Sequence, residues 1–106
     1  MTVLVPDRTT DQRLDALALA NRVRFKRARL KSRIRETPIL AAACVANPPE
    51  WLLSMPVEAL LKAVPKFGPV KVRKIMRGCE IAPSKTVGGL SGRQRDRLVA
   101  DLRGRL

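Results

Sequence analysis

The sequence predicts an all-α fold, in which a long N-terminal helix precedes a small helical domain. Proline residues stand where the predicted helices begin, and glycine residues stand where they end. Nowhere does a run of β-branched or aromatic residues alternate with polar residues over the length of a strand. A chain of 106 residues fits one compact domain with an appended arm. We therefore expect residues 1–36 to form an arm and a long basic helix, and residues 37–106 to form the helical domain.

The chain is strongly basic. It carries 22 Lys and Arg residues against 9 Asp and Glu residues, which gives a formal net charge of +13. A charge of this size creates a positive field that attracts polyanions. The charge alone does not separate DNA, RNA and an anionic membrane, and charge that serves only solubility is a further alternative.

The sequence predicts neither a metal site nor a membrane segment. Cys44 and Cys79 lack CxxC spacing and the chain has no histidine, so zinc would have too few ligands. We expect two reduced thiols, with Cys44 in the core, and no cofactor. The longest apolar run, Ile39 to Ala46, is too short to span a bilayer, and the N-terminus lacks the basic-then-apolar order of a signal peptide. These features favour a cytoplasmic protein.

The first predicted helix begins near Thr9 or Thr10, either of which can cap it, and ends at Glu36 before Thr37 and Pro38. At 1.5 Å per residue it would be roughly 40 Å long. Two apolar stripes run along opposite sides of it: Leu19, Val23, Leu30 and Ile34 on one, and Leu14, Leu17, Ala18, Phe25 and Ala28 on the other. We expect one stripe to dock on the domain.

Two basic flanks separate these stripes, and no acidic residue interrupts them. Arg22, Lys26, Arg29 and Arg33 form one flank, and Arg24, Arg27, Lys31 and Arg35 form the other. A solvated basic helix is the plainer interpretation. So many like charges repel one another, and a bound polyanion would relieve this repulsion. We therefore expect a polyanion to lie along this helix and to contact the flank that contains Arg22, Lys26, Arg29 and Arg33.

Short elements should follow. A helix from Pro38 to Ala46 and another from about Pro49 to Ser54 are separated by a hinge candidate, Asn47-Pro48-Pro49. We expect Trp51 to pack in the core and not to stack on a base. Three aromatic residues in total argue against recognition of single strands by stacking.

Residues 56–78 read as helix, tight turn, helix. Val57, Leu60, Leu61 and Val64 give the first helix an apolar face, and Val70, Val72, Ile75 and Met76 give one to the second. Pro65 stops the first helix, Phe67 can plug the junction, Gly68 lets the backbone approach a ligand, and Pro69 suits the first position of the second helix.

The start of that second helix predicts an anion site. The N–H groups of Val70 and Lys71 should point outward at the positive end of the helix dipole. Lys66, Lys71, Arg73 and Lys74 surround them with cations. We expect a DNA phosphate to bind there. The alternative is an ordinary helix start that is hydrated and binds no anion.

The last helix is capped by Ser91. Its apolar face, Leu98, Val99 and Leu102, should be core, while its arginines, Arg93, Arg95, Arg97, Arg103 and Arg105, are expected to be mostly solvated beside Asp96 and Asp101. Gly88-Gly89 should supply flexible, left-handed backbone before it.

Two stretches resemble the actinobacterial integration host factor family. They are Leu60 to Met76, which includes Pro65-Lys66-Phe67-Gly68-Pro69, and Ile81 with Ser84-Lys85-Thr86-Val87-Gly88-Gly89-Leu90. The resemblance extends from about Leu14 to the C-terminus. It implies a long helix joined to a helix-two-turns-helix domain, a type also found in a ribosomal protein and certain DNA glycosylases.

The resemblance also implies a function. Members of this family bind and bend duplex DNA with little sequence preference, organise the nucleoid and assist site-specific recombination. The implied contacts are the Gly68 turn and the loop with Ser84, Lys85, Thr86 and Gly88. The family's loop is rich in arginine, and this chain has Thr86 and Gly88 at two of those positions, so we expect weaker contact there.

The sequence therefore predicts a monomeric, nucleoid-associated binder of double-stranded DNA that can assist an integrase or another recombinase. Without histidine or clustered carboxylates the usual parts of an enzyme are missing, so we expect no catalysis. An RNA- or ribosome-associated protein is the alternative function, and a helix that binds a partner or a membrane surface is a third.

Overall fold

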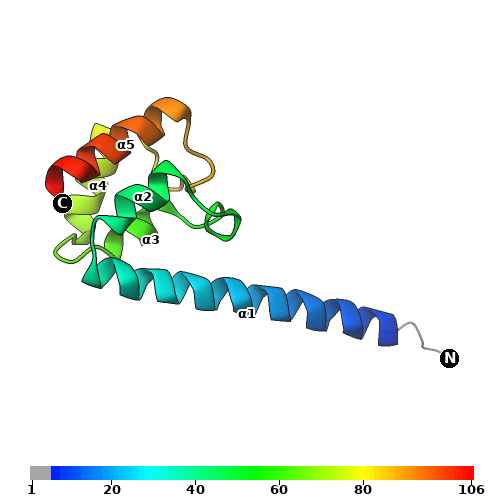
Figure 1. Cartoon of the computed structure of the whole chain (residues 1–106). Coiled ribbons are helices and arrows are strands. Elements are labelled where there is room, and N and C mark those ends of the chain that lie inside the picture. The colour runs from blue at the N-terminus through cyan, green and yellow to red at the C-terminus, as the bar shows by residue number, and fades with distance from the viewer. Residues whose placement is uncertain (1–5) are drawn as a thin grey trace.

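The computed structural model describes the backbone of residues 6–106, with side chains from Thr10 onward, and it is helical (Figure 1). The elements are α1 (Pro6–Glu36), α2 (Leu40–Ala46), the 3₁₀ helix η1 (Glu50–Leu52), α3 (Val57–Lys62), α4 (Pro69–Gly78) and α5 (Gly92–Arg105). No β-strand occurs within residues 6–106. The predicted all-α class is confirmed.

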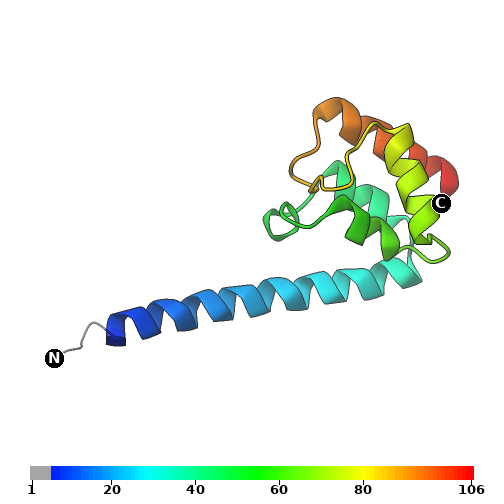
Figure 2. The ribbon, with the colours of Figure 1, turned by 180° about the vertical axis from the view of Figure 1, so that it is seen from behind.

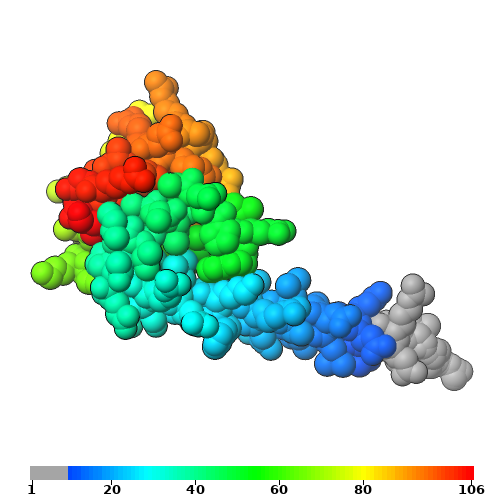
Figure 3. Space-filling model, viewed as in Figure 1, coloured from blue at the N-terminus to red at the C-terminus, as the bar shows by residue number. Residues whose placement is uncertain are grey.

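The molecule is elongated because α1 extends well beyond the rest of the chain (Figures 1 and 2). The principal extents are 63 × 27 × 24 Å and the radius of gyration is 17.3 Å. A compact domain of this length would have a radius of gyration of about 13 Å. In Figures 1 and 2 no other helix lies along the N-terminal half of α1, and in Figure 3 the coloured part of that half projects from the domain as a rod.

Helix α1 begins earlier than the sequence analysis expected. It starts at Pro6, a residue type that the first turn of a helix tolerates, so Thr9 and Thr10 lie within the helix and do not cap it. The side chain of Thr9 lies outside the described residues. The end at Glu36 is as predicted, and the N–H of Thr37 donates to the carbonyl of Arg33 at 2.8 Å.

Only the C-terminal half of α1 docks on the domain. Leu30 and Ile34 are buried and Val23 is half-buried. Leu19, which was expected in the same docked stripe, is 58% exposed because the domain does not extend that far along the helix. The opposite stripe faces away from the domain.

The domain core lies between two helix pairs, α2 with α5 and α3 with α4. Leu52, Leu60, Leu61, Leu98 and Leu102 are among its fully buried side chains.

The short elements that feed this core differ slightly from expectation. Pro38 and Ile39 form a turn, with the N–H of Ala41 donating to the carbonyl of Pro38 at 3.0 Å, so α2 starts at Leu40. The expected helix at residues 49–54 is a single 3₁₀ turn, η1. Trp51 packs partly buried against the core, as predicted.

The segments 53–57 and 84–90 lie side by side through backbone hydrogen bonds. The N–H of Val57 donates to the carbonyl of Lys85 (3.0 Å), that of Val87 to Met55 (2.9 Å) and that of Gly88 to Leu53 (2.8 Å). A Cβ atom on Gly88 would lie 2.9 Å from the carbonyl oxygen of Leu53. Gly88 is therefore needed for close approach, and the expected left-handed backbone at Gly88-Gly89 is wrong, since no glycine among the described residues has positive φ.

Helix α5 is capped as predicted. The Ser91 hydroxyl accepts from the N–H of Gln94 at 3.1 Å, and the Gln94 side chain accepts from the N–H of Ser91 at 3.0 Å. This reciprocal pair fixes the entry into the helix.

Both cysteines are free, and Cys79 is the buried one, whereas Cys44 is only half-buried and not in the core as expected. Burial raises the pKa of both thiols, so neither is a thiolate near neutral pH.

Candidate nucleic-acid interface

The turn between α3 and α4 presents an open helix N-terminus. Gly68 is the N-cap of α4 and Pro69 its first residue, as the sequence predicts, and no side chain in the described part of the chain caps this end. The N–H groups of Val70 and Lys71 lie in the first helical turn, where helix geometry supplies no acceptor. Val70 is 75% exposed. The helix start is therefore accessible.

The turn itself is held rigidly by Lys66 and Phe67. Lys66 adopts the left-handed conformation, with φ of 70°, and this bend brings Phe67 back into the core. The N–H of Phe67 donates to the carbonyl of Val64 at 3.1 Å. Lys71 Nζ lies 5.1 Å from the centroid of the Phe67 ring, a cation–π distance. Phe67 plugs the junction, as predicted.

Gly68 leaves space at the tip of the turn. A Cβ atom placed there would meet nothing within 4 Å, and its φ of −76° suits any residue. Within the chain, nothing requires glycine at this position. The absence of a side chain leaves the backbone open to a ligand.

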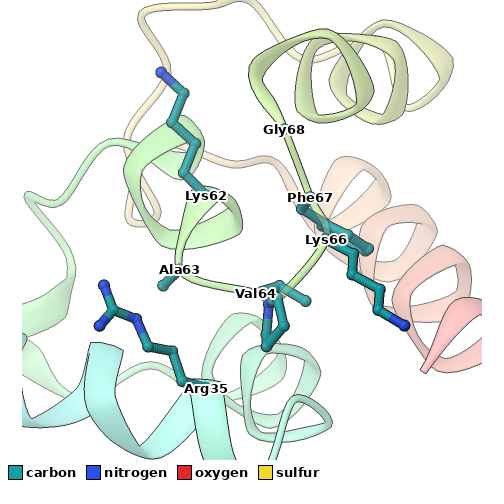
Figure 4. Close-up of a pocket in the computed structure, with 8 residues that line it drawn as sticks. Arg35, Lys62, Ala63, Val64, Lys66, Phe67 and Gly68 are labelled. Atoms are coloured by element: carbon teal, nitrogen blue, oxygen red, sulfur yellow. The ribbon is translucent and has the colours of Figure 1, made fainter.

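Grooves open on both sides of Gly68. One, of about 650 Å³, is lined by Arg35, Lys62, Ala63, Val64, Pro65, Lys66, Phe67 and Gly68. In Figure 4, Arg35 extends from α1 toward Ala63. Lys62 and Lys66 lie at the two ends of the segment that joins α3 to the Gly68 turn. The other groove, of about 510 Å³, is lined by Gly68, Val70, Lys71, Lys74 and Arg105. Cations thus surround the α4 N-terminus on both sides.

This arrangement includes three cations that the sequence analysis did not place at the turn: Arg35, Lys62 and Arg105. Arg35 and Arg105 have no local signal, because they come from α1 and α5, whereas Lys62 ends α3 only four residues before Lys66 and could have been found from the sequence. Two of them have acidic neighbours. Lys62 Nζ lies 3.0 Å from Glu58, and Arg105 Nε lies 2.8 Å from Asp101.

Arg73 is not in either groove beside Gly68. Its Nε lies 3.8 Å from Glu58, and it lines a separate groove of about 290 Å³ with Met76, Arg77, Ile81 and Pro83. The structure therefore brings Lys66, Gly68, Val70, Lys71 and Lys74 together, and Arg73 lies to one side of them, next to Lys62, with which it shares the Glu58 carboxylate.

The loop Ser84–Gly88 lies at the other end of α3 from the Gly68 turn. Lys85 accepts from the N–H of Val57, the first residue of α3, whereas the turn follows Lys62, the last. Six residues of helix span about 9 Å. The Gly88 N–H is already bonded to Leu53, and the Thr86 hydroxyl accepts from the N–H of Gly89 at 3.2 Å. Ser84 and Lys85 remain as the side chains that can reach outward.

The second predicted surface lies on α1. Arg22, Lys26, Arg29 and Arg33 are all exposed. Lys26, Arg29 and Arg33, with Leu30 and Trp51, line a groove of about 310 Å³ between α1 and η1. The Arg29 guanidinium lies 5.9 Å from the centroid of the Phe25 ring.

Three arginines expected to be free cations, Arg27, Arg95 and Arg97, donate to backbone carbonyls within the chain, and Arg97 donates to that of Gly78 at 3.0 Å. Arg27 donates to the carbonyl of Trp51 and to the hydroxyl of Ser54. Arg95 donates to the carbonyls of Val45 (2.7 Å) and Val87 (3.0 Å). Arg27 and Arg95 thereby hold segments of the fold together.

The described residues hold no cluster of three or more side chains suited to a metal ion. None of the described helices has the length and apolar character needed to cross a membrane.

These features define an all-helical protein with an H2TH domain, and the S13-like H2TH domain family matches residues 39–102. The chain is 41% identical to the integration host factors of Mycolicibacterium smegmatis and Mycobacterium tuberculosis over 97 residues, which cover 90% of this chain and 92% of each relative. It is 32% identical to the integration host factor of Streptomyces coelicolor over 92 residues, which cover 85% of this chain and 86% of that one. The chain belongs to the integration host factor family.

A solved structure is also similar. It is that of sIHF bound to an 8-base-pair palindromic DNA, with a TM-score of 0.69 and 26% sequence identity. The match covers 80% of this chain and 98% of that one. The long helix and the H2TH domain are therefore the family's fold.

Proposed function

We propose that this chain is an architectural protein that binds duplex DNA through its phosphates, with little regard for sequence. The observation that carries the proposal is the open N-terminus of α4 at Gly68, which lies between two cationic grooves. Free N–H groups at the positive end of a helix dipole bind phosphate oxygens well. The family relationship supports the same conclusion, since the similar sIHF structure holds DNA.

The loop with Ser84 and Lys85 can assist on the same duplex. The loop and the Gly68 turn lie at opposite ends of α3, a helix only about 9 Å long, so one duplex can contact both. The contact of the loop should be modest, because Thr86 and Gly88 carry no charge and their polar groups bond within the chain.

The basic flank of α1 supplies a second DNA surface on the other side of that helix. Arg35 lines the groove beside Gly68, whereas Arg33 lines the groove beside Trp51. Two residues of an α-helix differ by about 200° around its axis, so these side chains point to nearly opposite flanks. Contacts on both flanks would bend one duplex around α1 or bridge two duplexes.

In this proposal the protein performs no chemistry. It works at the nucleoid, in the cytoplasm, as a monomer when free, because a charge of +13 keeps copies apart in the absence of a polyanion. Bending of DNA by such a protein can bring recombination sites together for an integrase or another recombinase.

Titration of binding against salt tests the proposal. If about six phosphates are neutralised, log affinity falls against log salt with a slope of roughly −5. Duplexes of unrelated sequence should bind alike, and duplex RNA should compete poorly. A slope near zero or a strong preference for one sequence would contradict phosphate binding.

Charge reversal locates the principal surface. We expect Lys71→Glu with Lys74→Glu to weaken binding to short duplexes more than Lys26→Glu, Arg29→Glu and Arg33→Glu together. The α1 variant should instead lose bending or bridging of long DNA. Full retention of binding by the Lys71 and Lys74 variant would exclude the Gly68 turn as the main contact.

A further inference from the structure

The side of α1 that faces away from the domain carries large apolar side chains in water. Leu14, Leu17 and Phe25 are 58%, 56% and 63% exposed. With the exposed Ala18 and Ala28 they share one side of the helix over about four turns, with the polar Asn21 between Ala18 and Phe25, and such a one-sided apolar stripe is typical of a helix that packs on another helix. These five apolar residues are called here the outer face of α1.

The outer face is free of steric obstruction by the domain. Leu30 and Ile34, which dock α1, lie on nearly the opposite side of the helix. In Figures 1 and 2 the domain stands on one side of α1 only. Another long helix could lie along the outer face without touching the domain.

The charges along α1 are distributed unevenly, and this distribution selects the partner. From position 22 to position 35 the helix carries eight basic residues and no acidic one: Arg22, Arg24, Lys26, Arg27, Arg29, Lys31, Arg33 and Arg35. Nearer the N-terminus, residues 10–21 carry two acids, Asp11 and Asp15, and one base, Arg13, so the net charge of this section is −1. A second α1 running in the opposite direction would place these acids beside the basic section of the other copy. A parallel pair would place the basic sections together, which is unfavourable.

We propose that copies of this chain bound next to one another on DNA pair antiparallel through the outer face of α1. The inference rests on the proposed DNA binding, because the DNA phosphates neutralise the charge that keeps free copies apart. The contact spans only about two heptads and has small residues at two of its five positions, so it is too weak to hold a dimer in dilute solution. On DNA, where copies are close together, the same contact makes binding cooperative.

Neutral substitutions test the pairing. Leu14→Gln with Leu17→Gln removes apolar area from the outer face and leaves the charge unchanged. Leu19→Gln is the control, since Leu19 is equally exposed, at 58%, but lies on another side of the helix. Two measurements are needed: the affinity for a duplex that holds one copy, and the Hill coefficient for binding to long DNA.

The double variant should bind the short duplex with unchanged affinity, while its Hill coefficient on long DNA falls to about one. The Leu19→Gln control should match the parent protein in both measurements. Unchanged cooperativity of the double variant would overturn the proposal and leave the proposed function intact. A loss of short-duplex affinity in the double variant would also overturn it, because the outer face would then contact DNA.

Disulfide formation tests the direction of the pair. Leu14→Cys and Ala28→Cys are made separately in a chain that also carries Cys44→Ala and Cys79→Ala, and circular dichroism confirms that both variants fold. Mixed on long DNA with oxidised glutathione as the oxidant, the two variants should form a disulfide with each other much faster than either forms with itself. Preferential self-reaction of Leu14→Cys would overturn the antiparallel arrangement.

Discussion

The guanidinium of Arg27 donates two hydrogen bonds to the carbonyl oxygen of Trp51, at 3.3 Å from Nε and 3.2 Å from Nη2. The same Nη2 also donates to the hydroxyl of Ser54 at 2.5 Å. These bonds join α1 to the segment around η1 close to the point where the helix leaves the domain. We therefore expect this contact, together with the buried Leu30 and Ile34, to set the direction of the free part of α1.

Arg27→Ala should therefore loosen α1 from the domain. We expect a loss of about 1 kcal/mol in the free energy of unfolding, because a partly exposed, charge-assisted hydrogen bond contributes about that much. Arg24→Ala is the control, since it removes the same charge and Arg24 bonds only weakly to Asn21, at 3.4 Å.

Energy transfer between a dye on the free part of α1 and a dye on the domain measures the effect. The distance distribution should broaden in Arg27→Ala and stay narrow in Arg24→Ala. Equal distributions would show that the buried contacts of Leu30 and Ile34 alone orient the helix.

Gly68→Ala should separate DNA affinity from stability. The added Cβ meets nothing within 4 Å in the chain, so the stability loss should stay below about 1 kcal/mol. The methyl group would nevertheless hinder a phosphate held against the N-terminus of α4. We expect at least about a tenfold loss of affinity, or roughly 1.4 kcal/mol.

The matched control is Gly104→Ala, at a glycine in α5 whose added Cβ also meets nothing within 4 Å. It should bind DNA like the parent protein. Mobility shifts and thermal unfolding of both variants complete the test, and equal affinity of the Gly68→Ala variant would place the phosphate elsewhere.

Glu58 restrains one cation of the groove beside Gly68. A hydrogen bond from Lys62 and the charge of that residue hold the pKa of the Glu58 carboxyl below its ordinary value. The stabilisation that this pair gives is present above the ordinary pKa of glutamate and is lost as the pH falls through the lowered pKa of the folded state. Stability should accordingly decline in the acid range, and Glu58→Gln should flatten that decline.

The same substitution releases Lys62, and with it Arg73, for DNA. We expect Glu58→Gln to bind duplexes more tightly and to steepen the salt dependence by up to about one unit of slope. Glu50→Gln removes an equal charge at η1 and should change the slope less. If both variants gain equally, net charge and not the position of Lys62 sets the affinity.

The elements of the fold follow largely from local signals. Pro65 and Pro69 set where α3 stops and α4 starts, and Ser91 sets the start of α5, because proline and a capping hydroxyl act on the residues next to them. The predicted start of α1 was wrong because it relied on a local capping signal that was not decisive. Thr9 and Thr10 can cap a helix, but they are also tolerated inside one, and the helix continues back to Pro6.

The sequence predicts only the part of the candidate site that one continuous segment of the chain forms. The Gly68 turn carries its own signals, whereas Arg35 and Arg105 reach it through tertiary packing of α1 and α5. The roles of Arg27 and Arg95 also had no signal in the sequence. Their acceptors are backbone carbonyls, which every residue has, so only the folded chain shows which of them come close.

Arg95 should prove to be a structural residue. Its guanidinium joins the C-terminal part of α2, at Val45, to the loop at Val87, and the side chain is half-buried. Arg95→Ala removes both bonds and leaves two carbonyls without this donor, so we expect a loss of about 1.5–3 kcal/mol. For a domain of about 100 residues this corresponds to a melting temperature lower by at least about 6 °C.

Arg93→Ala is the control. It lies at an exposed position two residues earlier, removes the same charge and should melt within about 2 °C of the parent protein. Thermal unfolding followed by circular dichroism compares the two, and equal melting temperatures would mean that water replaces the Arg95 bonds at no cost.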